Sequence, residues 1–240
     1  MLSADTLAGR HILVTGGGTG LGRSMARRFV ELGARVTICG RRAEVLAAAA
    51  AELGPAVAAE RCDVRDHAAV EAMLDRIWAR APLDVLVNNA AGNLLAQSHR
   101  LSPRAVDAVL DIVLKGSTWC TLGAGRRWIE AGRGGTVLSI LTLSALQGGA
   151  FTLPSAMAKA GVLAMTKSLA VEWGPKGIRL VAIAPGNFPT PMPLRGSGPK
   201  AWAPWSGASR CAASASMPSL PSSPPSSSPT WPRTSPGRRW

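Results

Sequence analysis

The chain has 240 residues and a formal net charge of +13, yet all 14 acidic residues lie at or before Glu172 and eight of the 27 basic residues lie after it. The part up to Glu172 therefore carries 19 basic and 14 acidic residues, a surplus that suits an anionic cofactor and substrate and argues against a nucleic-acid binder. There is no apolar run of roughly 18 residues and no basic-then-apolar opening segment, so we expect no membrane insertion or secretion, and a cytoplasmic protein.

Short β-branched runs alternate with longer helical stretches over the first 186 residues. This alternation predicts an α/β fold, a Rossmann-like doubly wound parallel sheet with helices on both faces. Between residues 21 and 32, Met25, Phe29 and Leu32 recur at helical spacing and predict a buried helix face. We expect strands at residues 10–15, 35–39, 57–62, 84–88, 135–140 and 178–184.

A glycine-rich run, TGGGTGLG at residues 15–22, directly follows the first predicted strand and opens a helix. Gly16 permits a tight turn, Gly20 lets backbone amides approach a diphosphate, and Gly22 allows close helix packing. Thr19 and Leu21 complete the set of candidate contacts in this loop. The strand before the run and the helix after it make a dinucleotide site the favoured interpretation.

The second predicted strand ends in Cys39, Gly40, Arg41 and Arg42, without the acidic residue that would hold a ribose 2′-hydroxyl. Arg41 is suited instead to pair with a 2′-phosphate. The sequence therefore favours NADP(H) over NAD(H), the alternative being that both arginines are merely solvated at a helix start.

Together these motifs resemble those of the short-chain dehydrogenases and reductases. Besides the TGGGTGLG loop, the resemblance covers CDV at residues 62–64, NNAAG at residues 88–92 and PG at residues 185–186, collinear over some 170 residues. It implies that Asp63 contacts the adenine amino group, that Asn89 supports the central strand, and that Pro185 lies near the nicotinamide.

Most members of that family use a tyrosine and a lysine in a YxxxK motif, but this chain contains no tyrosine. At the corresponding position it reads SAMAK, so Lys159 is kept and Ser155 replaces the tyrosine. A serine hydroxyl is a far weaker acid than a phenol of pKa about 10. Ordinary carbonyl or alcohol redox chemistry is therefore disfavoured.

One branch of the family that lacks this tyrosine is the 2,4-dienoyl-CoA reductases, and residues 88–93 (NNAAGN), 111–116 (DIVLKG) and 138–179 are similar to it. The resemblance implies reduction of an acyl-CoA substrate by NADPH, in a homo-oligomer. Lys159 would hold the nicotinamide ribose and keep the pocket positive for a developing enolate. Ser144 stands where the mitochondrial members carry a tyrosine. Lys115 stands where they carry asparagine; it would polarise the thioester oxygen, the alternative being a solvent-facing lysine on a helix. Ser155, Ser144, Lys115 and Lys159 are thus the candidate catalytic residues.

The cysteines and histidines show no ligand spacing, so no metal site and no disulfide framework is predicted. The cysteines are expected to be small buried residues, and the histidines to lie at the surface or in loops. The residues concerned are Cys39, Cys62, Cys120, Cys211, His11, His67 and His99.

The composition changes after about Pro191, and residues 207–240 contain no acid, no Ile or Val and a single Leu. We therefore expect a Rossmann domain at residues 1–190, incomplete at its carboxyl end, and a non-native or disordered tail at 191–240. With suitable codons, residues 230–238 read in a shifted frame spell MAAYITGE, similar to the ending of the family. This suggests a frame shift between about residues 190 and 206.

Three other functions stay open on the sequence. The first is a short-chain oxidoreductase that acts on a carbonyl. The second is a nucleotide-binding protein without catalysis, and the third is a basic nucleic-acid binder, which only the charge of the tail supports.

Overall fold

The computed structural model describes residues 3–186 of the chain. The strands are β1 (His11–Thr15), β2 (Arg35–Gly40), β3 (Val57–Arg61), β4 (Val85–Asn88), β5 (Gly135–Ile140) and β6 (Ile178–Ile183). The α-helices are α1 (Gly20–Glu31), α2 (Ala43–Leu53), α3 (His67–Arg80), α4 (Pro103–Leu110), α5 (Gly116–Glu130), α6 (Ser144–Gln147) and α7 (Leu153–Trp173). Short helical turns are η1 (Ser98–Arg100), the π-helical η2 (Asp111–Lys115) and η3 (Gly174–Lys176).

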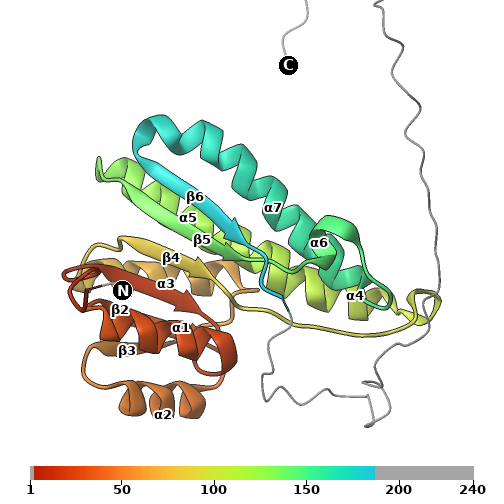
Figure 1. Ribbon diagram of the computed structural model, residues 1–240, viewed down its shortest axis with the longest axis horizontal. Helices are drawn as coiled ribbons and strands as arrows, with labels where there is room; N and C mark the ends of the chain where they lie inside the picture. Colours follow the sequence, from red (N-terminus) through yellow and green to blue (C-terminus); the bar gives the residue numbers. More distant parts are fainter. Residues whose placement is uncertain (1–2, 187–240) are drawn as a thin grey trace, which may run out of the picture. The chain divides into compact units, whose positions relative to one another are not determined.

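All neighbouring strands pair in parallel, in the order β3-β2-β1-β4-β5-β6 (Figure 1). Successive crossovers run outward from β1 in one direction and then, from β4 onward, in the other. This reversal leaves a crevice at the carboxyl ends of β1 and β4, the place where open α/β sheets bind their ligands. The predicted doubly wound parallel fold is confirmed.

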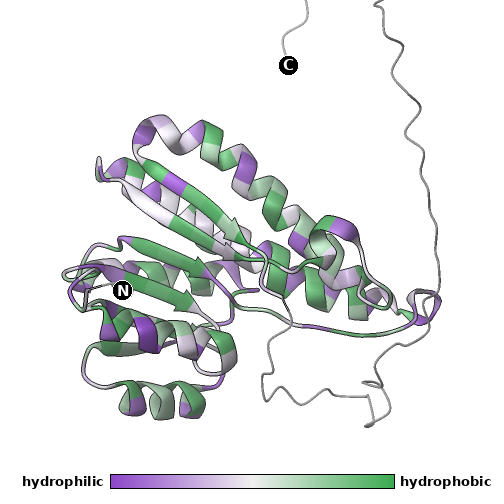
Figure 2. Ribbon diagram, viewed as in Figure 1, coloured by the Kyte–Doolittle hydropathy of each residue, from purple (hydrophilic) through white to green (hydrophobic). Residues whose placement is uncertain are grey.

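Helices cover both faces of the sheet, and each face has its own core. Alternate residues of β1 divide between the two: Leu13 packs in the cluster formed with α3, α5 and α7, whereas Ile12 and Val14 pack with α1 and α2. Most of β1 and β4 is hydrophobic (Figure 2), with the polar residues at the strand ends. Such apolar runs are typical of strands buried on both sides. They explain why these strands can be predicted from the sequence.

The predicted strands match the observed ones to within two residues at each end, and the predicted helix at residues 21–32 is α1. Leu32 is buried, and Met25 and Phe29 pack against the core from α1. Cys39, Cys62 and Cys120 are buried free thiols, as expected. Cys211 lies outside the described residues.

The prediction that His11 lies at the surface or in a loop is wrong. His11 is the first residue of β1 and is buried. Its ring shares hydrogen bonds with the Thr37 hydroxyl, at 2.9 Å from Nε2, and with the Ala81 carbonyl, at 3.2 Å from Nδ1. Partners 26 and 70 residues away satisfy the buried ring, and no local sequence pattern reveals them.

The predicted tail at residues 191–240 and the inferred frame shift lie outside the described residues. Within residues 3–186, none of the helices has the length and apolar character needed to cross a bilayer.

Candidate active site

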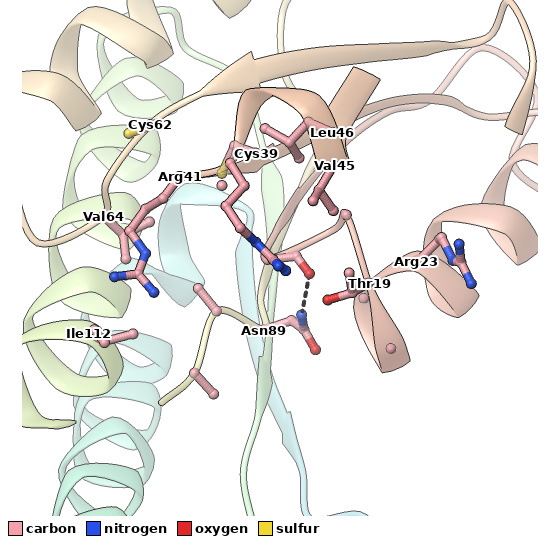
Figure 3. Close-up of a pocket in the computed structure, with 18 of the residues that line it drawn as sticks. Thr19, Arg23, Cys39, Arg41, Val45, Leu46, Cys62, Val64, Asn89 and Ile112 are labelled. Atoms are coloured by element: carbon pink, nitrogen blue, oxygen red, sulfur yellow. Dashed lines mark hydrogen bonds between the residues drawn. The ribbon is translucent and has the colours of Figure 1, made fainter. Parts of the chain in front are cut away.

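A cleft of about 620 Å³ opens at the carboxyl ends of β1, β2 and β4 (Figure 3). Its walls are the loop after β1, the end of β2, the turn after β3 and the segment after β4. Eight of the predicted cofactor contacts line it together: Gly16, Thr19, Gly20, Leu21, Gly22, Arg41, Asp63 and Asn89. The other two, Lys159 and Pro185, lie outside this lining, on α7 and just after β6.

The glycine-rich loop has a shape that other residues would not tolerate. Gly16 and Gly20 adopt φ angles of +67° and +53°, which favour glycine. A Cβ atom on Gly22 would lie 2.4 Å from the Gly16 carbonyl oxygen. The loop is therefore drawn tightly against the start of α1.

The start of α1 is electrostatically open to an anion. Its N-cap, Thr19, makes no side-chain capping hydrogen bond, and the first turn contains no acidic residue. The free amide groups and the helix dipole thus act on the cleft without a competing carboxylate. This tight glycine cradle and uncapped helix start fit the diphosphate of a dinucleotide.

Asn89 and Thr15 join the ends of β1 and β4 beside the cleft. The Asn89 Nδ2 donates to the carbonyl oxygens of Thr15 at 2.9 Å and Gly16 at 3.3 Å. The buried Thr15 hydroxyl accepts from the backbone amides of Asn89 at 3.0 Å and Ala90 at 2.9 Å, and it donates to Val87. Sequence reasoning did not single out Thr15, although a threonine ending an otherwise apolar strand is a signal.

Charged groups surround the cleft where the adenosine half of a dinucleotide would lie. Arg41 and Asp63 both line it, and so do Arg23 and Arg42, which the sequence reasoning did not include as contacts. Hydrogen bonds from Arg65 lower the pKa of Asp63, with a smaller electrostatic contribution from Arg41. Asp63 is thus a carboxylate at neutral pH.

Lys159 is buried beneath the end of β5. Its residue is 6% exposed, and its Nζ donates to the carbonyl of Ile140, the last residue of β5. Burial lowers the pKa of this lysine to about 8, because solvent no longer stabilises the charged form.

The hydroxyl groups of Thr142 and Ser144 follow β5 in the chain. Ser144 begins α6, and its Oγ lies 3.4 Å from the Thr142 Oγ1. Ser155 is half-buried in α7, one helical turn before Lys159. Thr142 was missed by the sequence reasoning, and its proximity to Ser144 is the only sign that it belongs here.

Lys115 ends the π-helical turn η2 with its side chain 59% exposed. Its Nζ lies 2.7 Å from Asp111 Oδ1, an i,i+4 ion pair that raises the pKa of Lys115. Asp111 is a partner that the sequence reasoning did not consider. The described residues contain no cluster of three or more His, Cys, Asp or Glu side chains able to hold a metal ion.

Comparison with known proteins identifies the class. The family model for short chain dehydrogenases matches residues 10–196, so the chain belongs to the short-chain dehydrogenase family, whose members are oxidoreductases that use a nicotinamide nucleotide.

Individual relatives agree with this class. The chain is 47% identical over 195 residues to an uncharacterized oxidoreductase of Caenorhabditis elegans, covering 79% of this chain and 62% of that protein. It is 42% identical over 182 residues to a protein of Bacillus subtilis named probable 2,4-dienoyl-CoA reductase, covering 74% and 72%. The crystal structure of a short chain dehydrogenase from Bacillus anthracis superposes with a TM-score of 0.72 at 41% identity, covering 74% and 76%. The chain thus spans less than two thirds of the length of the Caenorhabditis relative.

Proposed function

We propose that this chain is an NADP(H)-dependent reductase of 2,4-dienoyl-CoA thioesters. The observation that carries the proposal is a buried lysine, Lys159, with serine instead of tyrosine four residues before it. A site without a phenol is poorly suited to protonate an alkoxide, but it suits a reaction whose negative charge spreads over a thioester enolate. The similarity to relatives named 2,4-dienoyl-CoA reductases supports the same substrate class.

Preference for NADP(H) rests on the charges at the end of β2. Arg41 lines the cleft beside Asp63, and Arg42 follows it, with no acidic residue at this strand end. A guanidinium forms strong hydrogen bonds to a phosphate. We assign Arg41 to the 2′-phosphate, Asp63 to the adenine amino group, and the loop from Gly16 to Gly22 to the diphosphate.

When bound, the reduced cofactor would supply a hydride to the far end of the conjugated thioester, and a proton from solvent would then go to the carbon next to the carbonyl. The ammonium of Lys159, protonated at neutral pH, holds the nicotinamide ribose and makes the site positive where the enolate charge develops. The hydroxyl of Ser144 donates to the thioester oxygen. Ser155, near the start of α7, is assigned to the same catalytic site. Pro185 lies against the nicotinamide.

We assign Lys115 to polarising the thioester oxygen. To do so, its ammonium group has to break the ion pair with Asp111. The exposed ion pair costs little to break, because solvent screens it and hydrates both groups once they separate. We further propose that the chain works in the cytoplasm as a homo-oligomer and that residues 1–190 form the cofactor-binding domain.

The test is the oxidation of NADPH by the full chain with 2,4-hexadienoyl-CoA, compared with simple ketones. We expect turnover of the dienoyl thioester alone. Reduction of ketones at a comparable rate would replace the proposal with a general carbonyl oxidoreductase, and NADPH binding without any turnover would indicate a non-catalytic nucleotide-binding protein.

Two variants test the assigned roles. Lys159→Ala should lose most of kcat because it removes both ribose contact and positive charge, whereas Ser144→Ala should lose less. Near-normal kcat in Lys159→Ala together with no turnover in Ser144→Ala would overturn the assignment.

A further inference from the structure

Arg65 holds the carboxylate of Asp63 with both its side chain and its backbone amide. Its Nε lies 3.0 Å from each of the two carboxylate oxygens, and its Nη2 lies 2.5 Å from Oδ2. Its backbone amide also donates to Oδ1, at 3.1 Å. Asp63 is among the residues that line the cleft, and Arg65 is not.

The backbone of this turn is fixed independently of Arg65. The amide of Cys62 donates to the Gly40 carbonyl at 2.8 Å, and the amide of Asp66 donates to the Asp63 carbonyl at 3.0 Å. The rotation of the Asp63 side chain is limited by the backbone amide of Arg65, and the guanidinium adds the hydrogen bonds that hold both carboxylate oxygens. Three N–H groups of Arg65 thus occupy the carboxylate, and one of its roughly four lone-pair sites is left for a ligand in the cleft that Asp63 lines.

The neighbouring charges keep this carboxylate ionised. Arg65 lowers the pKa of Asp63 most, and Arg41 adds a smaller contribution from the end of β2. Asp63 in turn raises the pKa of Arg65, and Asp111 of η2 adds a smaller electrostatic contribution. The Cys62 thiol, whose pKa is raised to about 11, stays neutral. An ionised carboxylate is an acceptor only.

An acceptor-only group at the base subsite distinguishes purines by the substituent at position 6. The 6-amino group of adenine donates a hydrogen bond to it, whereas the 6-oxo group of hypoxanthine directs an acceptor at an acceptor. We propose that Arg65 is a positioning residue that, through Asp63, makes this cleft selective for a 6-aminopurine dinucleotide over a 6-oxopurine one. The inference rests on the dinucleotide site proposed above.

The experiment titrates the full chain with NADPH and with its deaminated analogue, reduced nicotinamide hypoxanthine dinucleotide phosphate, following tryptophan fluorescence. The unaltered chain should bind NADPH about tenfold more tightly than the analogue, as expected for one charge-assisted hydrogen bond. Arg65→Leu should bring NADPH affinity close to that of the analogue and leave the analogue's affinity within about threefold.

Arg61→Leu is the matched control, because it removes the same charge from an exposed position at the end of β3. It should weaken both nucleotides alike and preserve their ratio. Asp63→Asn should abolish the preference, since an amide offers either a donor or an acceptor to the base. Circular dichroism verifies that each variant is folded.

The ratio of the two affinities separates positioning from a merely structural role. A loss of structure weakens both nucleotides alike, whereas the loss of the hydrogen bond to the 6-amino group changes only the affinity for NADPH. Equal weakening of both nucleotides in Arg65→Leu, or no preference in the unaltered chain, would overturn the inference. Failure to bind either nucleotide would instead overturn the proposed function, and failure to reduce a dienoyl thioester leaves these binding ratios unaffected.

Discussion

Replacing Lys159 with methionine removes an ammonium group that is buried beneath the end of β5, and it should abolish a pH-dependent part of the stability. The pKa of Lys159 in the folded chain is about 8, against an ordinary value of 10.5, and burial is the cause. Between these two values the unfolded chain binds more protons than the folded one. The free energy of unfolding contributed by this group therefore rises as the pH rises from about 8 to about 10.5.

The size of the effect follows from the difference in pKa. Each unit corresponds to about 1.4 kcal/mol, so the folded chain carries a penalty of about 3 kcal/mol below pH 8 that disappears by about pH 10.5. Methionine, of similar length, carries no such penalty at any pH. It also leaves the Ile140 carbonyl without its donor, which adds a pH-independent cost of about 1 kcal/mol.

The assay is urea unfolding of both proteins, followed by tryptophan fluorescence at a series of pH values from 7 to 10.5. Other groups titrate in this range: burial raises the pKa of Cys39, Cys62 and Cys120, which lowers the stability as the pH rises above about 9. These thiols are common to both proteins, so the difference between the two unfolding free energies isolates Lys159. The absence of tyrosine removes a further source of titration.

The difference, unaltered chain minus Lys159→Met, should increase by about 3 kcal/mol over this range. A difference that stays constant with pH would refute the reasoning, because it would mean that the lysine keeps its ordinary pKa in the folded chain.

Three further predictions concern the cleft and the core. Arg41→Ala should reduce the preference for NADPH over NADH by about tenfold, the value of one charge-assisted contact, and equal affinities in the unaltered chain, measured by fluorescence titration, would contradict the assignment. Gly22→Ala should weaken nucleotide binding and cost about 1 to 3 kcal/mol of stability, because its Cβ would lie 2.4 Å from the Gly16 carbonyl oxygen. Gly174→Ala is the control: its Cβ meets nothing within 4 Å, so neither nucleotide binding nor stability should change. Burial lowers the pKa of His11, so stability should fall as the pH drops below about 6.5, and a His11→Phe chain unfolded in urea at the same pH values should lose that part of the dependence.

The sheet was predictable because its signal is local and repeated. Each strand of a parallel sheet covered on both faces is built around a short apolar run, which forms the middle of β1 and the first three residues of β4. The glycine-rich loop was predictable for a similar reason: Gly16, Gly20 and Gly22 are close in sequence and meet a single steric requirement. Their conformations and close contacts agree with the turn that the sequence predicts.

Contacts between side chains from different elements were not predictable in this way. The partners of His11 come from β2 and from the loop after α3, and nothing in the spacing of histidines reveals them. Thr15 contacts the segment after β4, 74 residues away. Arg65 is only two residues from Asp63, yet its effect depends on the side-chain geometry of the turn rather than on a pattern of residue types.

Two buried charged residues, Glu60 and Lys159, differ in whether an opposite charge accompanies them, and this difference bears on function. Glu60, in β3, is buried but accepts from Arg76 at 3.1 Å and Arg80 at 2.5 Å, so its desolvation is offset within the chain. Lys159 is buried to a similar degree, yet burial alone shifts its pKa and no acidic side chain of the described residues contributes. A cation left in this state raises the free energy of the free protein and lowers that of any state in which a negative charge develops beside it. The stability lost at Lys159 is therefore available, in the proposed reaction, to stabilise an enolate that the chain has no tyrosine to protonate.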